Sequence, residues 1–202
     1  MTAWIPTEDP FPHVVVDGHW DTPLLDAVAR EFPHPDDPRW RRYSNSQEGK
    51  YEGPETMWGP ETRRLFDKIR ALTGFISDAF AIPGLSMETI GGGYHLIPPG
   101  GHLDVHTDFS RSPDTGLYRR LNCLIYLNRD WADPGGRLEL WPDGGDPLAI
   151  APEHNRTVIF ATSSRSWHGH PTPAQRWRCS VAAYFFSDDP PDGFVEQSTV
   201  WR

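Results

Sequence analysis

Residues 100–109, Gly-Gly-His-Leu-Asp-Val-His-Thr-Asp-Phe, are the most informative stretch for the fold. After the glycines, polar and mainly apolar side chains alternate, as in a β-strand. Because successive side chains of a strand point to opposite faces, His106 and Asp108 project side by side from one face. An imidazole and a carboxylate placed in this way can bind one metal ion together. A His-x-Asp pair also occurs by chance on solvated surfaces, so the metal site needs support from the rest of the chain.

A third metal ligand is available in Trp167-His168-Gly169-His170-Pro171. One further histidine would complete a 2-His-1-carboxylate triad, which leaves coordination positions open and is typical of Fe(II) oxygen chemistry. His168 and His170 share a strand face, so periodicity does not choose between them. Pro171 favours a turn that begins at His170, which places His168 nearer the regular end of the strand. We therefore predict His168 as the ligand, with His170 beside the ligands or facing a substrate.

Composition limits the classes of function. The 202 residues carry a formal charge of −9 without any Lys/Arg-rich run, which argues against binding to nucleic acid or to an anionic membrane. No apolar run long enough to span a membrane and no secretory signal is visible, so we expect one cytoplasmic domain over residues 1–202. Cys123 and Cys179 lie in strand-like apolar runs, and we expect both to be reduced core residues.

The pattern of elements predicts helices followed by many short strands. Residues 13–17 are expected to form a strand, Pro23 to Glu31 a helix capped by Thr22, and residues 60–80 a second helix. Further strands are predicted at 86–90, 93–97, 102–108, 120–128, 137–141, 147–150, 156–161, 165–168 and 176–186. Short strands separated by Gly- and Pro-containing turns are typical of a sandwich or jelly roll. The fold class is therefore α+β and mainly β, with an N-terminal segment over 1–85, a core over 86–187 and a tail over 188–202.

Residues 33–60 are polar, rich in proline and interspersed with aromatic residues, and no period survives in them. A loop of this length in a compact domain is usually functional or disordered. We interpret the segment as an ordered substrate lid that includes Trp40, Lys50 and Trp58.

A second constellation lies on two later strands. Arg178 and Ser180 share one face of the last strand, and a guanidinium directed into the fold is costly unless a carboxylate pairs with it. An incoming dicarboxylate would be that partner, held by charge-assisted hydrogen bonds. Tyr126 can donate its hydroxyl to the same carboxylate, and Asn122 shares the strand face of Tyr126. The alternative is an exposed strand end with Arg178 in water, which the metal-binding pattern disfavours.

Together these segments resemble the iron- and 2-oxoglutarate-dependent dioxygenases of the prolyl-4-hydroxylase-like branch. The resemblance is strong over residues 86–187 and looser over 13–85. The motifs that carry it are His106-Thr107-Asp108, Arg120-Leu121-Asn122, the run 126–131, the run 135–140, the Pro152 turn, Val158-Ile159-Phe160, His168 and Arg178-x-Ser180.

The resemblance implies a double-stranded β-helix (jelly roll) core with the N-terminal helices packed on it. It implies that His106, Asp108 and His168 bind iron and are the catalytic centre. Arg178, Tyr126 and Ser180 would bind the C5 carboxylate of 2-oxoglutarate, and Asn122 would hydrogen-bond the cosubstrate or an iron-bound group.

One departure from the family concerns the strand before the metal motif. Many relatives carry a tyrosine there, whereas this chain has Tyr94-His95, so either residue is expected to face the pocket. We include His95 among the cofactor-binding residues.

The implied reaction uses Fe(II), 2-oxoglutarate and O2, with ascorbate as reductant, to hydroxylate a C–H bond. Asp108 supports hydroxylation, because halogenating relatives carry a small residue there. The substrate could be a small molecule, a free amino acid or a peptidyl or carrier-bound residue. Alternatives are desaturation, cyclisation or epoxidation on the same iron core, a cupin-type metalloenzyme without 2-oxoglutarate, and a non-catalytic metal-binding jelly-roll module.

Overall fold

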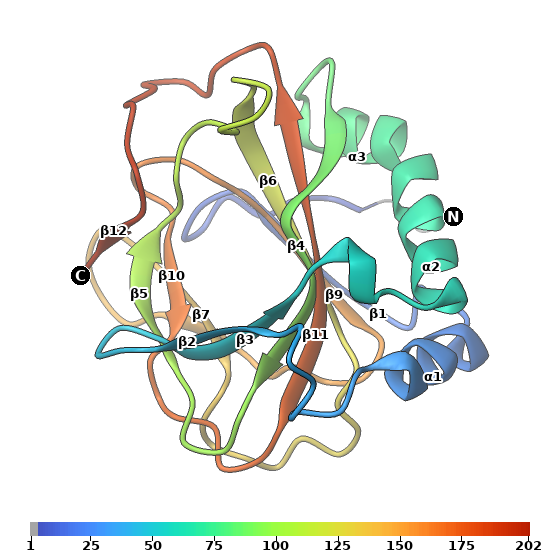
Figure 1. Cartoon of the computed structure of the whole chain (residues 1–202). Helices are drawn as coiled ribbons and strands as arrows, with labels where there is room; N and C mark the ends of the chain where they lie inside the picture. The colour runs from blue at the N-terminus through green and yellow to red at the C-terminus, as the bar shows by residue number, and fades with distance from the viewer. Residues whose placement is uncertain (1–3) are drawn as a thin grey trace.

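Two antiparallel β-sheets face each other in the computed structural model, which describes residues 4–202 (Figure 1). The first three residues of the expected N-terminal segment lie outside the described residues. The larger sheet has the order β1 (His13–Asp17), β9 (Arg156–Ala161), β6 (Tyr118–Tyr126), β11 (Arg178–Ser187), β4 (Ser86–Ile97), β3 (Gly49–Gly53) and β2 (Arg41–Ser44). The smaller sheet has the order β12 (Val200–Trp201), β5 (Leu103–Thr107), β10 (Trp167–His170), β7 (Leu138–Trp141) and β8 (Leu148–Ile150). The predicted mainly β fold is confirmed.

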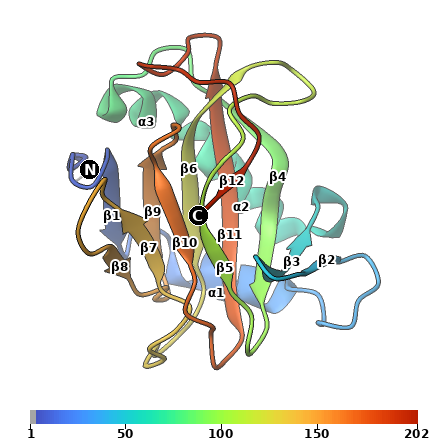
Figure 2. The ribbon, with the colours of Figure 1, turned by 90° about the vertical axis from the view of Figure 1, so that its left-hand side faces the viewer.

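Helices cover the outer face of the larger sheet, as both ribbon views show (Figures 1 and 2). They are α1 (Thr22–Glu31), the short 3₁₀ helix η1 (Glu55–Met57), α2 (Pro60–Ala71) and α3 (Thr73–Phe80). Alternation along β6 explains the packing, since Leu121, Cys123 and Ile125 enter the core beneath the helices. On the opposite face of the same strand, Tyr126 packs with Leu140 and Phe160 between the two sheets. None of the helices in residues 4–202 has the length and apolar character needed to cross a membrane.

Several predicted elements have different boundaries. The helix expected over 60–80 is two helices, separated at Leu72, whose amide bonds to Ile69 O in a 3₁₀-type step. Thr22 is the first helical residue and Asp21 occupies the N-cap position, so Thr22 does not cap α1. The strands expected at 86–90 and 93–97 are one strand, β4, which carries positive φ at Gly91 and Gly93. A register shift against β11 accompanies these glycines, because a bulge permits one continuous but bent strand.

The expected lid of residues 33–60 is largely integrated into the fold. β2 and β3 form a hairpin that extends the larger sheet from β4. Trp40 and Trp58 are buried, and Trp58 stacks on Phe66 with ring centroids 3.8 Å apart, so their assignment to a substrate lid is wrong. Buried aromatic residues resemble ligand-covering ones in sequence because both offer a large apolar surface. Lys50 does line the cavity beside the metal-binding residues.

Residues 188–202 are more than a tail. Val200 and Trp201 form β12, which pairs with Thr107 and His106 of β5. Upstream of it, the Gln197 side chain donates to Thr107 Oγ1 at 2.8 Å and to Asp108 O at 2.9 Å. The C-terminal segment therefore closes over the strand that carries the His-x-Asp motif (Figure 2).

Candidate metal centre

Three side chains converge between the sheets as the sequence predicted. His106 lies on β5, Asp108 follows that strand, and His168 pairs with His106 across the β5–β10 ladder. One ligand atom of each residue lies within 4.8 Å of those of the other two. Asp108 Oδ1 is 3.8 Å from His106 Nε2, and Oδ2 is 3.4 Å from His168 Nε2. This set of two imidazoles and one carboxylate fits a facial metal site with open positions.

The two histidines are oriented for metal binding. Nδ1 of His106 donates to Asp104 O at 2.8 Å, and Nδ1 of His168 donates to Ser166 O at 2.8 Å. Because a carbonyl oxygen can only accept, each Nε2 is left free as a ligand atom. Burial, reinforced by the nearby His168, lowers the pKa of His106 to about 4, and burial also lowers the pKa of His168. Both rings are thus kept in the neutral form that a metal requires.

The carboxylate of Asp108 is held by two residues of β6. Asn122 Nδ2 donates to Asp108 Oδ2 at 2.8 Å, and the buried Arg119 approaches Asp108 Oδ1 at 3.3 Å. Arg119 Nε also donates to Asn122 Oδ1 at 2.9 Å, and its guanidinium lies over the Tyr184 ring. Burial by itself raises the pKa of Asp108, but Arg119 and the imidazoles outweigh it and keep that pKa well below the usual range. Asn122 was expected to contact a cosubstrate or an iron-bound group, and the structure places its amide on Asp108.

Arg119 was missed by the sequence analysis for a definite reason. Asn122 and Tyr126 face the space between the sheets, so strict alternation would direct residue 119 outward. The β6–β11 register shifts between Phe185 and Phe186, so that Phe186 pairs with Arg119. This irregularity lets Arg119 face the same side as Asn122. No local sequence signal marks the shift.

Asn122→Leu should weaken Mn(II) binding by roughly 10- to 100-fold, because partners that orient metal ligands typically contribute that much. The substitution leaves Asp108 Oδ2 without its amide donor and Arg119 Nε without its acceptor. Calorimetric titration of Mn(II) into the metal-free protein measures the effect. Arg120→Gln is the matched control, because Arg120 lies on the same strand and bonds to Ser187 and Asp189 instead. Equal Mn(II) affinities for wild type and Asn122→Leu would contradict the assignment.

The metal-binding residues line a cavity that Arg178 also lines. The arginine is 3% exposed, donates from Nε to Gly136 O at 2.7 Å and approaches Tyr126 OH with Nη2 at 3.3 Å. Burial lowers the pKa of Arg178 and raises that of Tyr126. No carboxylate side chain within residues 4–202 pairs with this guanidinium. Ser180 lines the same cavity, so the structure brings the three predicted residues together.

His170 also lines this cavity and does not belong to the metal-ligand cluster. Strand β10 ends at His170, and a register shift separates this residue from His168, which lies in the regular part of the pairing with β5. The side chain is buried and its Nδ1 has no hydrogen-bond partner in the described chain. Burial and then the charge of Arg178 lower its pKa well below the usual value.

Tyr94 and His95 take opposite sides of β4. Tyr94 OH lies 2.6 Å from Thr62 Oγ1 and its ring packs on Phe32, beneath the helices. His95 lines the cavity and donates from Nε2 to Gly91 O at 3.1 Å. Of the two, His95 therefore faces the pocket.

Stability of the metal-free protein should fall as the pH drops from 6.5 to about 4, and His95 contributes to this fall. Burial, followed by the charge of Lys50, lowers the pKa of His95 from 6.5 to about 4. In that window the unfolded state binds the proton and the folded state does not, so stability is full above the window and is lost below it. His95→Gln should reduce the slope by up to about 1.4 kcal/mol per pH unit. Urea unfolding across the window measures it, and parallel curves would refute the assignment.

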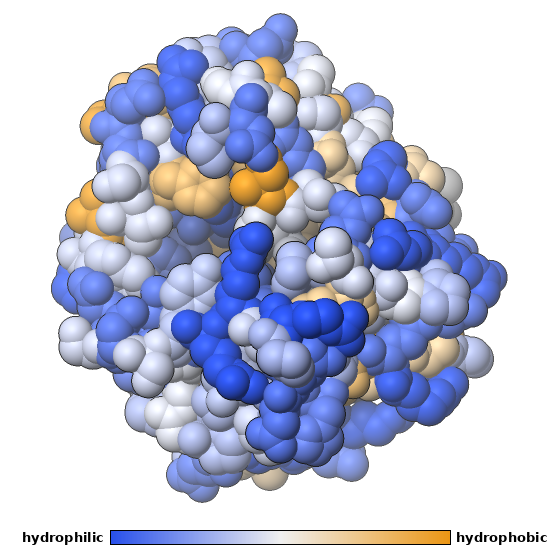
Figure 3. Space-filling model, in the orientation of Figure 1, coloured by the Kyte–Doolittle hydropathy of each residue, from blue (hydrophilic) through white to orange (hydrophobic). Residues whose placement is uncertain are grey.

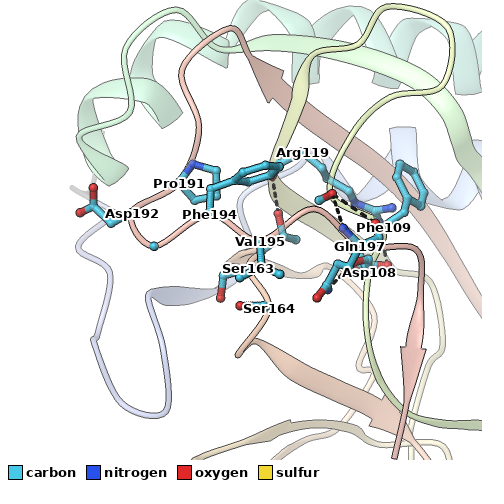
Figure 4. A pocket seen from close by; sticks show the side chains of 13 residues that line it. Asp108, Phe109, Arg119, Ser163, Ser164, Pro191, Asp192, Phe194, Val195 and Gln197 are labelled. Atoms are coloured by element: carbon cyan, nitrogen blue, oxygen red, sulfur yellow. Dashed lines mark hydrogen bonds and ion pairs between the residues drawn. The ribbon is translucent and has the colours of Figure 1, made fainter.

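The outer region of the site is formed by the β2–β3 hairpin and by β12. Tyr43 and Lys50 come from the β2–β3 hairpin, and Trp201 comes from β12, with its ring centroid 4.9 Å from that of His106. The space-filling view of this face is hollowed near its centre, with strongly hydrophilic side chains below the hollow (Figure 3). On the other side of Asp108, the tail residues Phe194 and Val195 line a second cavity (Figure 4).

Comparison with known proteins agrees with this geometry. The family model described as 2OG-Fe(II) oxygenase superfamily matches residues 92–186. Egl nine homolog 1 of Rattus norvegicus and that of Homo sapiens are each 29% identical over 147 residues, which is 70% of this chain. The match covers 40% of the rat and 32% of the human protein, so the chain spans less than half the length of these relatives.

Solved structures share the fold. A Pseudomonas putida prolyl-4-hydroxylase superposes with a TM-score of 0.68 at 19% identity, over 87% of this chain and 92% of the other. A Trichoplax adhaerens prolyl hydroxylase, solved with a hypoxia inducible factor peptide fragment, gives 0.69 at 15% identity over 87% and 84%. The two facing sheets thus form the expected double-stranded β-helix. Over residues 92–186 the chain is thus similar to the 2OG-Fe(II) oxygenase superfamily, and its fold is the one seen in prolyl-4-hydroxylases.

Proposed function

We propose that the protein is an Fe(II)- and 2-oxoglutarate-dependent oxygenase that hydroxylates an unactivated C–H bond. The observation that carries this proposal is a single cavity that holds both a metal-ligand triad and a buried guanidinium without a carboxylate partner. A buried, unpaired charge is costly, so its retention next to a metal site indicates an anionic ligand. A non-catalytic metal-binding module would have no need of that guanidinium.

The residues present fit the iron and the cosubstrate. His106, Asp108 and His168 would hold Fe(II), and Arg178 with Tyr126 would hold the distal carboxylate of 2-oxoglutarate. When bound, the iron and its cosubstrate supply the oxidising chemistry: O2 and 2-oxoglutarate are converted to succinate and CO2, and one oxygen atom enters the C–H bond of the substrate.

The protein's own residues bind and orient the metal and its ligands, and they exclude water from the site. Asn122 and Arg119 hold the Asp108 carboxylate in place, and the carbonyls of Asp104 and Ser166 fix the rings of the two histidines. Four apolar side chains also line the cavity, namely Ile97, Leu124, Leu138 and Phe160. A preorganised, largely buried site strengthens each of these electrostatic contacts. Ser180 and His95 also line this cavity, and we assign them to the cosubstrate pocket.

The substrate would enter from the outer region of the site, between Lys50 and Tyr43 on one side and Trp201 on the other. The Trichoplax relative was solved with a peptide, which supports a peptidyl residue within the substrate class. A free amino acid, a small molecule and a carrier-bound residue are the other members of that class. Desaturation or cyclisation on the same iron core is the second candidate outcome of the reaction.

The first test is succinate formation from 2-oxoglutarate with Fe(II), ascorbate and O2. We expect slow turnover by the wild-type protein without added substrate, and its loss when a chelator removes the metal. Candidate substrates are then added one at a time, and a true substrate should increase the rate of succinate formation. Absence of turnover, together with absence of 2-oxoglutarate binding to the Mn(II)-loaded protein, would refute the proposal and favour the non-catalytic module.

A further inference from the structure

The cavity is lined by a buried histidine that the proposed function does not yet use. His170 is 3% exposed and lines the cavity together with Arg178 and Ser180. Most buried polar atoms in proteins have a hydrogen-bond partner, and an exception needs an explanation. Nδ1 of His170 is such an exception among residues 4–202.

The backbone holds His170 firmly at this place. His170 pairs with Leu103 of β5, and the preceding Gly169 allows β10 to press against that strand. A Cβ at position 169 would lie 2.7 Å from Asp104 O and 2.8 Å from Leu103 O, closer than side chains tolerate. The close packing of β10 on β5 therefore fixes the backbone next to His170.

The neighbours of His170 indicate what its missing partner is. Arg178 donates hydrogen bonds to Gly136 O and Tyr126 OH. A guanidinium has five N–H groups, so these two acceptors leave some of its donors unsatisfied. An imidazole offers at least one N–H donor in either protonation state. With its proton on Nδ1, His170 would be a second donor in the cavity beside the unsatisfied N–H groups of Arg178, and two such donors suit an anion with more than one oxygen atom.

We propose that His170 donates a hydrogen bond to the distal carboxylate of 2-oxoglutarate beside Arg178, and thereby makes the site selective for 2-oxo diacids. This inference rests on the proposed function, because it assumes that 2-oxoglutarate occupies the cavity. It assigns to His170 a binding role distinct from metal ligation by His168.

Calorimetric binding to the Mn(II)-loaded protein tests the role without relying on turnover. The ligands are 2-oxoglutarate and 2-oxobutyrate, which has the same 2-oxo acid head but no distal carboxylate. His170→Val should weaken 2-oxoglutarate binding by roughly tenfold or more, since a hydrogen bond to a charged group is lost. Binding of 2-oxobutyrate should not change. His170→Gln, which retains an N–H donor, should recover some of the affinity.

His102→Val is the matched control, because His102 contacts Ser46 O and does not line the cavity. It should bind both ligands as the wild type does, and all variants should keep the Mn(II) affinity of the wild type. Unchanged 2-oxoglutarate affinity in His170→Val would overturn the inference and leave an ordered water as the partner of Nδ1. An equal loss of affinity for 2-oxoglutarate and 2-oxobutyrate would also overturn it, because it would indicate a general effect on packing. If the wild type fails to bind 2-oxoglutarate, the proposed function itself fails, and the inference with it.

Discussion

Replacement of His168 by alanine should reduce Mn(II) affinity by more than about hundredfold, because even the partners of metal ligands typically contribute 10- to 100-fold. His168 Nε2 is 3.4 Å from Asp108 Oδ2, and its Nδ1 is already bonded to Ser166 O. No other imidazole in the described chain can replace it without rearrangement, since His170 lies outside the ligand cluster. Succinate formation should be lost together with the metal.

His170→Ala is the informative comparison for this experiment. The sequence left these two histidines on one strand face, and the structure separates them by a register shift. Calorimetric titration of Mn(II) should therefore give a wild-type affinity for His170→Ala. If the metal affinity followed His170 instead, the third ligand would be misassigned, and the β10 register with it.

Arg178→Met should abolish measurable 2-oxoglutarate binding to the Mn(II)-loaded protein, a loss on the order of hundredfold or more. The guanidinium is the only buried cation in the described residues that both lines the cavity and lacks a carboxylate partner. Methionine fills a similar volume without the charge. Mn(II) affinity should be kept, because Arg178 does not contact the metal ligands.

The same variant should be as stable as the wild type, or more stable by about 1 to 2 kcal/mol, when no 2-oxoglutarate is present. Burial of an unpaired guanidinium opposes folding, and the loss of its bond to Gly136 O offsets some of the gain. Adding 2-oxoglutarate at about 100 times its dissociation constant should stabilise only the wild type, by about 2.7 kcal/mol. Urea unfolding with and without the ligand measures both effects. A strongly destabilised Arg178→Met protein would show that the arginine serves the fold rather than a ligand.

Local patterns account for much of the site. Period-two alternation placed His106 with Asp108, and Arg178 with Ser180, on single strand faces, and the structure agrees. The strand His13–Asp17 was predicted at its observed bounds for the same reason. These features depend on neighbours in the chain, which a sequence displays directly.

Other features depended on contacts between distant segments. Trp58 and Trp40 lie in the core because α2 and β4 pack over them, and their composition alone resembled that of a lid. Arg119 reaches Asp108 only through an irregular pairing of β6 with β11. Trp201 lies against His106 because the C-terminal segment pairs with β5, far from it in sequence.

The order of residues along the chain was thus sufficient to predict the two-sheet core, the metal ligands and the buried arginine. Alternation within a strand paired His106 with Asp108 and Arg178 with Ser180, whereas the choice of His168 and the two-sheet core also needed the turn residues and the family resemblance. What surrounds that chemistry became visible only in three dimensions: the support of Asp108 by Arg119 and Asn122, the unpaired imidazole of His170 and the closure by β12. Those features arise from strand register and from packing between distant segments, where small free-energy differences choose among arrangements that the local pattern allows equally.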